Sequence, residues 1–189
     1  MSDNSLTLSL ARLPRALGST LHQDLVWVTP DDLGTPSMSA VPGVPLDVSV
    51  DFTSVEDGVL VQLATSVDLV GECVRCLDEV RDHHDVSSAE VYFEPGAPAL
   101  TPTDDEDEEA EDLFVIGERD TISIETQLRD AIVPLVDPRP LCAPDCAGLC
   151  DVCGEKWADL PEDHDHFVVD PRLASLASLL GEDSELGRS

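Results

Sequence analysis

The sequence predicts an α+β protein: an antiparallel β-sheet with a few helices and a cysteine-rich C-terminal segment. Three observations lead to this class. Apolar and β-branched segments follow one another closely between residues 46 and 93, as in an antiparallel meander. Residues 124–133 have the apolar spacing of an amphipathic helix. Four cysteines then lie between residues 142 and 153, among prolines and glycines that disfavour regular structure.

The strands are predicted from the alternation of apolar and polar side chains. Residues 46–52 alternate strictly, which is the period of a half-buried strand. Residues 56–58, Glu-Asp-Gly, supply a turn, and a long β-branched segment follows at 59–70. Residues 86–93 give the third strand of the meander, and residues 6–10 give a short strand near the N-terminus.

Two helices are expected in the second half of the chain. Ser123 is placed to cap a helix over residues 124–133. Asp170 and Pro171 combine a carboxylate at the N-cap with proline in the first turn, so a closing helix is expected to begin there. Their apolar faces consist of Ile124, Leu128, Ala131 and Ile132 in the first helix, and of Leu173, Leu176, Ala177 and Leu180 in the second.

Composition divides the chain into four expected regions. Residues 1–95 form a β-rich region that contains the first cysteine pair. Residues 96–120 form an acidic, disordered linker, because proline, threonine and a run of acidic residues at 104–112 cannot bury an apolar core. Residues 121–181 hold the first helix, the cysteine-rich segment and the closing helix, and residues 182–189 form a tail.

The charge balance limits which partners the protein can bind. Forty acidic residues against ten basic ones give a formal net charge of -30. Because free nucleic-acid binders gain affinity by neutralising phosphates with Lys and Arg, a broad RNA-binding surface is excluded. Contact with RNA must be local, or be made through a basic partner protein.

The sequence also predicts where the protein works. No apolar run approaches the roughly 20 residues that a membrane-spanning helix needs. The N-terminus lacks the apolar segment of a signal peptide. A cytoplasmic protein without membrane contact is therefore expected. Lysine occurs once, at Lys156, and arginine and alanine are frequent, which is typical of a GC-rich bacterial genome.

The six cysteines carry the strongest chemical signal. They are spaced Cys-x2-Cys at residues 73–76 and Cys-x3-Cys-x3-Cys-x2-Cys at residues 142–153, and His164 and His166 follow. A Cys-x2-Cys turn places two thiolates at the separation that a tetrahedral Zn²⁺ requires. Gly148 and Gly154 can take the positive φ that such turns need. One or two structural Zn²⁺ ions are therefore expected to pin the C-terminal segment.

Two ligand arrangements fit this spacing. The preferred one has a first site of Cys73, Cys76, Cys142 and Cys146 and a second site of Cys150, Cys153, His164 and His166. The other joins the two Cys-x2-Cys pairs in one site like that of a zinc ribbon, and leaves Cys142 and Cys146 spare. The two histidines are also compatible with a polar loop that holds no metal.

Two other uses of the cysteines are less consistent with the sequence. Disulfides suit exported proteins, whereas the cytosol keeps thiols reduced. A thioredoxin-like pair requires a helix N-terminus, which lowers the thiol pKa. Cys73 and Cys76 instead fall between predicted strands, and Cys150 and Cys153 follow a proline-rich loop.

Three motifs resemble one known family. Residues 73–77, CVRCL, resemble the C-x-R-C-L element of the YceD family, the large ribosomal RNA subunit accumulation proteins. Residues 141–154, LCAPDCAGLCDVCG, and residues 170–176, DPRLASL, resemble two further elements of that family in the same order. The resemblance spans residues 40–180. Some relatives have cysteines where His164 and His166 stand, which implies that the histidines replace them as ligands.

The resemblance implies a ribosome-biogenesis factor that supports the synthesis, processing or stability of 23S ribosomal RNA. It supplies no catalytic residue, and the sequence has no phosphate-binding loop, metal-hydrolase motif or nucleophile elbow. We therefore expect a non-enzymatic adaptor for ribosomal or ribosome-assembly proteins, with 23S RNA as an indirect partner and no evident small-molecule substrate.

Two alternatives to the adaptor remain open. The first is direct RNA contact by a local basic patch near the cysteines, made by Arg75, Arg139, Lys156 and Arg172. In the competing interpretation these residues pair with neighbouring acidic groups. The second alternative is a redox-sensing switch, in which oxidation of the thiolates releases zinc.

Overall fold

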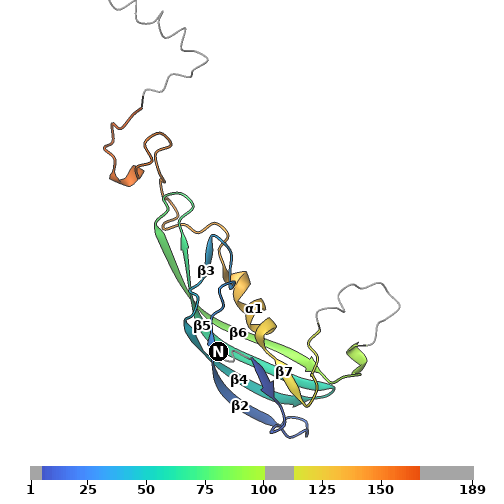
Figure 1. Cartoon of the computed structure of the whole chain (residues 1–189). Coiled ribbons are helices and arrows are strands. Elements are labelled where there is room, and N and C mark those ends of the chain that lie inside the picture. The colour runs from blue at the N-terminus through green and yellow to red at the C-terminus, as the bar shows by residue number, and fades with distance from the viewer. Residues whose placement is uncertain (1–5, 101–112, 167–189) are drawn as a thin grey trace, which may run out of the picture. The chain divides into compact units, whose positions relative to one another are not determined.

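The computed structural model of the chain describes residues 6–100 and 113–166 (Figure 1). The predicted linker run at 104–112, the closing helix at 170 and Arg172 lie outside these residues. The chain divides into two compact units, Met1–Cys146 and Ala147–Ser189. Within the described residues, no helix is long and apolar enough to cross a bilayer.

The larger unit is built on a five-stranded antiparallel sheet. Its strands are β2 (Thr20–Val28), β3 (Met38–Ala40), β4 (Pro45–Val55), β5 (Gly58–Glu72) and β6 (Glu79–Phe93). Strand β5 pairs with β6 along one edge, and with β4 and then β3 along the other, while β2 pairs with β4. The predicted antiparallel meander of β4, β5 and β6 is confirmed.

Alternation of side chains explains why β4 and β5 form. In β4, Leu46, Val48, Val50 and Phe52 are buried, and the polar residues between them face outward. The predicted turn is also present, because β4 ends at Val55 and β5 begins at Gly58, with Asp57 at a positive φ of 65°. Gly58 is required there, since a Cβ would collide with the carbonyl oxygen of Tyr92.

Strand β6 begins earlier than residues 86–93 predict. It starts at Glu79 and pairs with β5 over its whole length, from Glu79 opposite Glu72 to Phe93 opposite Gly58. Residues 79–85 are mostly charged or histidine and give no apolar alternation, so their strand structure comes from pairing with β5. This extension brings the ends of β5 and β6 together beside Cys73.

One α-helix lies in the described residues, and it packs beside β6 (Figure 1). It is α1 (Glu125–Ile132), and its predicted apolar residues Ile124, Leu128 and Ile132 are fully buried. Ser123 is not its cap, which corrects the prediction. Ser123 ends β7 (Thr121–Ser123), which pairs with β1 (Thr7–Ser9), and the N-cap position is Ile124, without a side-chain bond.

A buried polar contact fixes α1 on the sheet. Gln127 is 1% exposed, and its side-chain amide donates to the carbonyl oxygen of Val61 in β5 at 3.1 Å and to the Ser88 hydroxyl in β6 at 3.2 Å. The Tyr92 hydroxyl donates to the Ser123 carbonyl at 3.0 Å and contacts the Gln127 side-chain oxygen at 3.3 Å. Because each buried polar atom needs its partner, these bonds select one position of the helix on the sheet.

Candidate metal centres

Two tight turns of the same backbone geometry hold the Cys-x2-Cys pairs. We call residues 73–78 knuckle 1 and residues 150–155 knuckle 2. In knuckle 1 the Cys73 N–H donates to the Asp78 carbonyl at 2.7 Å, and the Leu77 N–H donates to the Cys73 carbonyl at 2.9 Å. In knuckle 2 the corresponding bonds from Cys150 and Gly154 are 2.8 and 2.9 Å. Both turns therefore place their two sulfur atoms on the same side.

The first group of ligand atoms belongs to the larger unit. It consists of the thiols of Cys73, Cys76, Cys142 and Cys146, whose sulfur atoms all lie within 4.8 Å of one another. Two sulfur–sulfur distances are 3.8 Å, from Cys73 to Cys146, and 3.4 Å, from Cys76 to Cys142. A tetrahedral zinc with bonds of 2.3 Å separates its sulfur ligands by about 3.8 Å. The group therefore has the dimensions of a tetrathiolate zinc site.

Hydrogen bonds outside the sulfur atoms hold this first group together. The Arg75 guanidinium of knuckle 1 donates to the Cys146 carbonyl at 2.8 Å, and the Val74 N–H donates to the Pro140 carbonyl at 2.9 Å. These two bonds tie the knuckle to the segment that carries Cys142 and Cys146. Arg75, which the sequence suggested as an RNA contact, thus has a partner within the chain.

The second group belongs to the smaller unit. Cys150, Cys153, His164 and His166 bring one ligand atom each to within 4.8 Å of the others. The Cys153 sulfur lies 3.6 Å from Nε2 of His164, and mixed zinc ligands at bonds of 2.3 and 2.0–2.1 Å are separated by about 3.6 Å. Nε2 of His166 is buried without a hydrogen-bond partner. A buried ring nitrogen without a partner is costly, and a bound cation would satisfy it.

The first cysteine of each knuckle has a lowered thiol pKa, whereas the neighbouring thiols raise the pKa values of Cys76 and Cys142. The backbone N–H of Cys142, followed by two N–H groups inside knuckle 1, lowers the pKa of Cys73 to about 6 against the effect of burial. In knuckle 2 the N–H groups of Cys153 and Val152 likewise lower the pKa of Cys150. Since the thiolate is the form that binds metal, the first cysteine of each knuckle favours a ligand role.

All six cysteines are free thiols. The measured sulfur separations exceed the roughly 2.05 Å of a disulfide bond. Cys73 and Cys76 lie in the turn between β5 and β6, and neither pair sits at the start of α1. The geometry therefore suits metal coordination better than a redox pair activated by a helix dipole.

The remaining basic candidates differ in their surroundings. Arg139 is exposed, and its backbone N–H donates to the Asp137 carboxylate at 2.8 Å. Lys156 is half-buried and forms a β-bridge with Leu149 in the smaller unit. Two residues beside the clusters were not singled out from the sequence. Trp157 is 39% exposed, and its ring centroid lies 5.4 Å from that of His164. Leu77 lies in knuckle 1, next to Cys76.

These features define a mostly antiparallel β protein with two four-residue cysteine and histidine clusters, each able to hold a metal ion. The family model of the Large ribosomal RNA subunit accumulation protein YceD matches residues 61–180. The chain belongs to the YceD family. This match includes both knuckles and all eight cysteine and histidine residues of the clusters.

The chain is also similar to proteins of several mycobacteria. Proteins described as uncharacterized from Mycobacterium bovis and Mycobacterium tuberculosis are each 35% identical over 180 residues, which is 95% of this chain and 84% of the relative. A protein of Mycobacterium leprae, also described as uncharacterized, is 33% identical over 141 residues, or 75% of this chain and 62% of its own length. No solved structure matches the chain.

Proposed function

We propose that the chain is a non-catalytic, zinc-stabilised adaptor that supports the accumulation of 23S ribosomal RNA during ribosome assembly. The process is taken from the family, whose name specifies accumulation of the large-subunit ribosomal RNA. The observation that carries the molecular role is the presence of two complete sets of four ligands. A catalytic zinc keeps one position open for water or substrate, usually with three protein ligands, whereas four protein ligands are typical of structural zinc.

The charge of the chain favours proteins as its direct partners. A formal charge of -30 repels phosphate over most of the surface and attracts the basic proteins of the ribosome. Arg75, one of the few basic residues near the knuckles, already donates to the Cys146 carbonyl. An adaptor that binds basic assembly proteins therefore fits the molecule better than a broad RNA-binding surface.

One observation favours a second candidate function, direct RNA binding by knuckle 2. Trp157 is partly exposed, and its neighbour Lys156 is basic. An exposed aromatic ring can stack on an unpaired base, and a lysine can contact the adjacent phosphate. This candidate predicts that Trp157→Ala weakens binding to single-stranded RNA fragments, and that binding falls steeply as salt is raised.

Zinc counting tests the structural part of the proposal. Protein purified with zinc should carry two ions per chain, and Cys142→Ser should carry one, because only the first group loses a ligand. Ser87→Ala, an exposed change on β6, is the matched control and should keep both. One ion per wild-type chain, with the same content in Cys142→Ser, would contradict the two-site arrangement.

The cellular role is tested by depletion of the protein in its bacterial host. We expect the ratio of 23S to 16S RNA to fall, and expression of the wild-type chain to restore it. Cys142→Ser should restore it less well than Ser87→Ala. An unchanged ratio after depletion would contradict the proposed function, whereas binding of naked 23S fragments at low salt would favour the RNA-binding candidate.

A further inference from the structure

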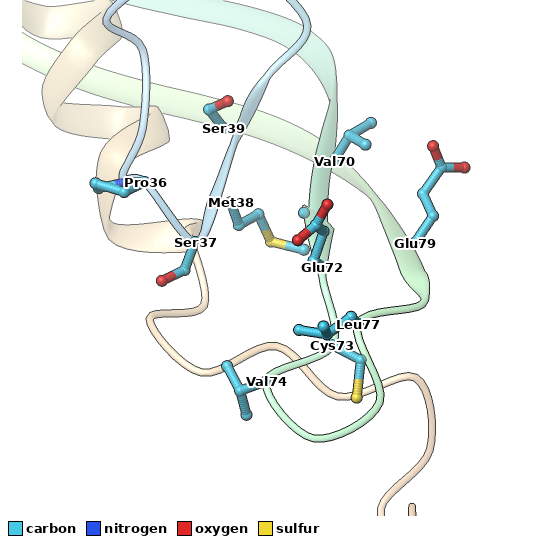
Figure 2. A pocket seen from close by; sticks show the side chains of 11 residues that line it. Pro36, Ser37, Met38, Ser39, Val70, Glu72, Cys73, Val74, Leu77 and Glu79 are labelled. Atoms are coloured by element: carbon cyan, nitrogen blue, oxygen red, sulfur yellow. The ribbon is translucent and has the colours of Figure 1, made fainter. Parts of the chain in front are cut away.

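A pocket of about 640 Å³ lies beside knuckle 1 (Figure 2). Four segments line it: residues 36–39 around the start of β3, the C-terminal end of β5, knuckle 1 itself, and the first residue of β6. Figure 2 shows the Cys73 sulfur on the knuckle side of the pocket, away from Ser39 and Val70.

The backbone holds the pocket walls close together. The β3 segment pairs with β5 through Met38 opposite Gly71, and a Cβ on Gly71 would collide with the carbonyl oxygen of Ser37. Met38 is 3% exposed and belongs to the apolar core. Val74 and Leu77, from knuckle 1, are 46% and 60% exposed and present apolar surface to the pocket.

The backbone conformation of Leu77 is unfavourable for a leucine. Its φ is 63°, in the left-handed region that suits glycine, and its side chain gains little from burial. The equivalent residue of knuckle 2 is Gly154, with a φ of 75°. A strained, exposed leucine at a position that glycine fills elsewhere in the same chain indicates a use for its side chain. The use available to Leu77 is as an apolar wall of the pocket.

The rim of the pocket is acidic. Glu72 and Glu79 both line it and both are exposed. Glu79 pairs with Arg81 at 2.7 Å, whereas the Glu72 carboxylate has no ion pair or hydrogen bond within the part of the chain that the structure describes. An occupant that joins an apolar group to a positive charge would complement both features of the pocket.

We propose that this pocket is the docking site for an extended, lysine- and arginine-rich segment of a large-subunit ribosomal protein. An apolar side chain of that segment packs against Val74 and Leu77, and a neighbouring basic side chain pairs with Glu72. The inference rests on the proposed adaptor function and deepens it, because it assigns the partner-binding surface. The apolar contact gives specificity, and the -30 charge of the chain accelerates association.

The test uses the full-length, zinc-loaded protein and the total proteins extracted from purified large ribosomal subunits, freed of RNA. Binding of individual ribosomal proteins is measured for the wild type, Leu77→Gly and Leu77→Asn. Glycine and asparagine both tolerate the left-handed backbone but remove the apolar wall. The matched control is Leu17→Ser, which changes a leucine that is 72% exposed and does not line the pocket.

We expect the wild type and Leu17→Ser to bind the same basic proteins. Both Leu77 variants should bind them at least tenfold more weakly, with unchanged zinc content and with a thermal midpoint at or above that of the wild type. Glu72→Lys should weaken binding at low salt more than at high salt. A photo-reactive amino acid at position 77 should cross-link to lysine- or arginine-rich segments.

Three results would overturn the proposal, and they differ in what they leave of the adaptor function. Equal binding by the wild type and Leu77→Gly would exclude the pocket and leave the adaptor function standing. Failure of the wild type to bind any large-subunit protein would contradict both. Cross-links from position 77 to RNA, in the presence of 23S fragments, would also exclude a protein segment as the occupant.

Discussion

The two knuckles share a backbone conformation and differ in the residues that surround them. Each donates the N–H of its first cysteine to a carbonyl five residues later, and each has a positive φ at its fifth residue. Knuckle 1 is grouped with thiols from far along the chain, since Cys76 and Cys142 are 66 residues apart. Knuckle 2 is grouped with histidines nearby in the sequence, since Cys153 and His164 are 11 residues apart. The same turn thus closes a long loop in one unit and a short loop in the other.

Loop length predicts that the two ions stabilise the protein unequally. The entropy cost of closing a flexible loop rises with the logarithm of its length, so the sixfold longer loop costs about 1.5 kcal/mol more to close in the unfolded chain. An ion that holds the long loop closed would therefore offset a larger entropy cost than an ion that closes the short loop. We therefore expect the sheet unit to depend more on an ion in the first cluster than the smaller unit depends on an ion in the second.

The largest expected effect is the loss of a buried ligand of the first cluster. Cys73→Ser should remove one of two zinc ions and lower the thermal midpoint by about 10 °C, because Cys73 is fully buried at the end of β5. Cys153→Ser should remove the other ion and lower the midpoint by about 2 °C at most. Metal analysis and calorimetry measure both, and equal shifts would remove the distinction between the clusters.

The second expected effect is confined to the smaller unit. His166→Ala should release the second ion and keep the first, because Nε2 of His166 is a buried atom of this cluster that lacks a hydrogen-bond partner. Loading of this cluster should change the fluorescence of Trp157, which lies beside His164, and not that of the buried Trp27. His22→Ala, in an exposed part of β2, is the control and should keep both ions. Retention of two ions by His166→Ala would contradict the ligand assignment.

A smaller effect is expected from the residue that ties knuckle 1 to its distant ligands. Arg75→Val introduces the residue type of the equivalent position in knuckle 2, Val152, and removes the bond to the Cys146 carbonyl. Zinc affinity of the first cluster should fall about tenfold, as for other residues that orient ligands. Competition with a chelator measures this. Arg139→Val is the control, because its bond to Asp137 comes from the backbone.

The smallest effect tests the fifth residue of each knuckle. Leu77→Gly should raise the free energy of unfolding by about 1 kcal/mol, since glycine adopts the left-handed backbone without strain. Gly154→Ala should instead lower the free energy of unfolding, because alanine is strained at this positive φ. It should also lower the zinc affinity of the second cluster about fivefold. Urea denaturation and chelator competition measure these changes. A loss of stability in Leu77→Gly would show that the leucine contributes to the fold.

Local sequence patterns predicted much of the sheet. The alternation in β4 and the turn before Gly58 depend on neighbouring residues, and the structure has both. The first half of β6 was missed because its polar residues form a strand only through pairing with β5. The predicted N-cap of α1 was wrong for a related reason. Ser123 belongs to β7, whose position is fixed by pairing with β1 near the N-terminus.

In the candidate sites, too, local features were predictable from the sequence and contacts between distant segments were not. The spacing predicted that each Cys-x2-Cys pair is a local unit, and of the two arrangements that fitted it the structure brings together the groups of the preferred one. Neither the hydrogen-bond partner of Arg75 nor the positive φ of Leu77 was predicted from the sequence. Arg75 reaches a carbonyl that only the fold brings near, and a leucine in a left-handed conformation contradicts its intrinsic preference. The signal for Leu77 was its alignment with Gly154 when the two motifs are superposed.

The separation of Cys76 from Cys142 also has a consequence during translation. At the roughly 5–20 residues per second of protein synthesis, about 3 to 13 s pass between the addition of these two cysteines. For that interval the nascent chain presents only half of the first ligand set, on the hairpin of β5 and β6. The four-thiolate cluster can assemble only after residue 146 has left the exit tunnel, so zinc capture there would follow the synthesis of all five strands of the sheet.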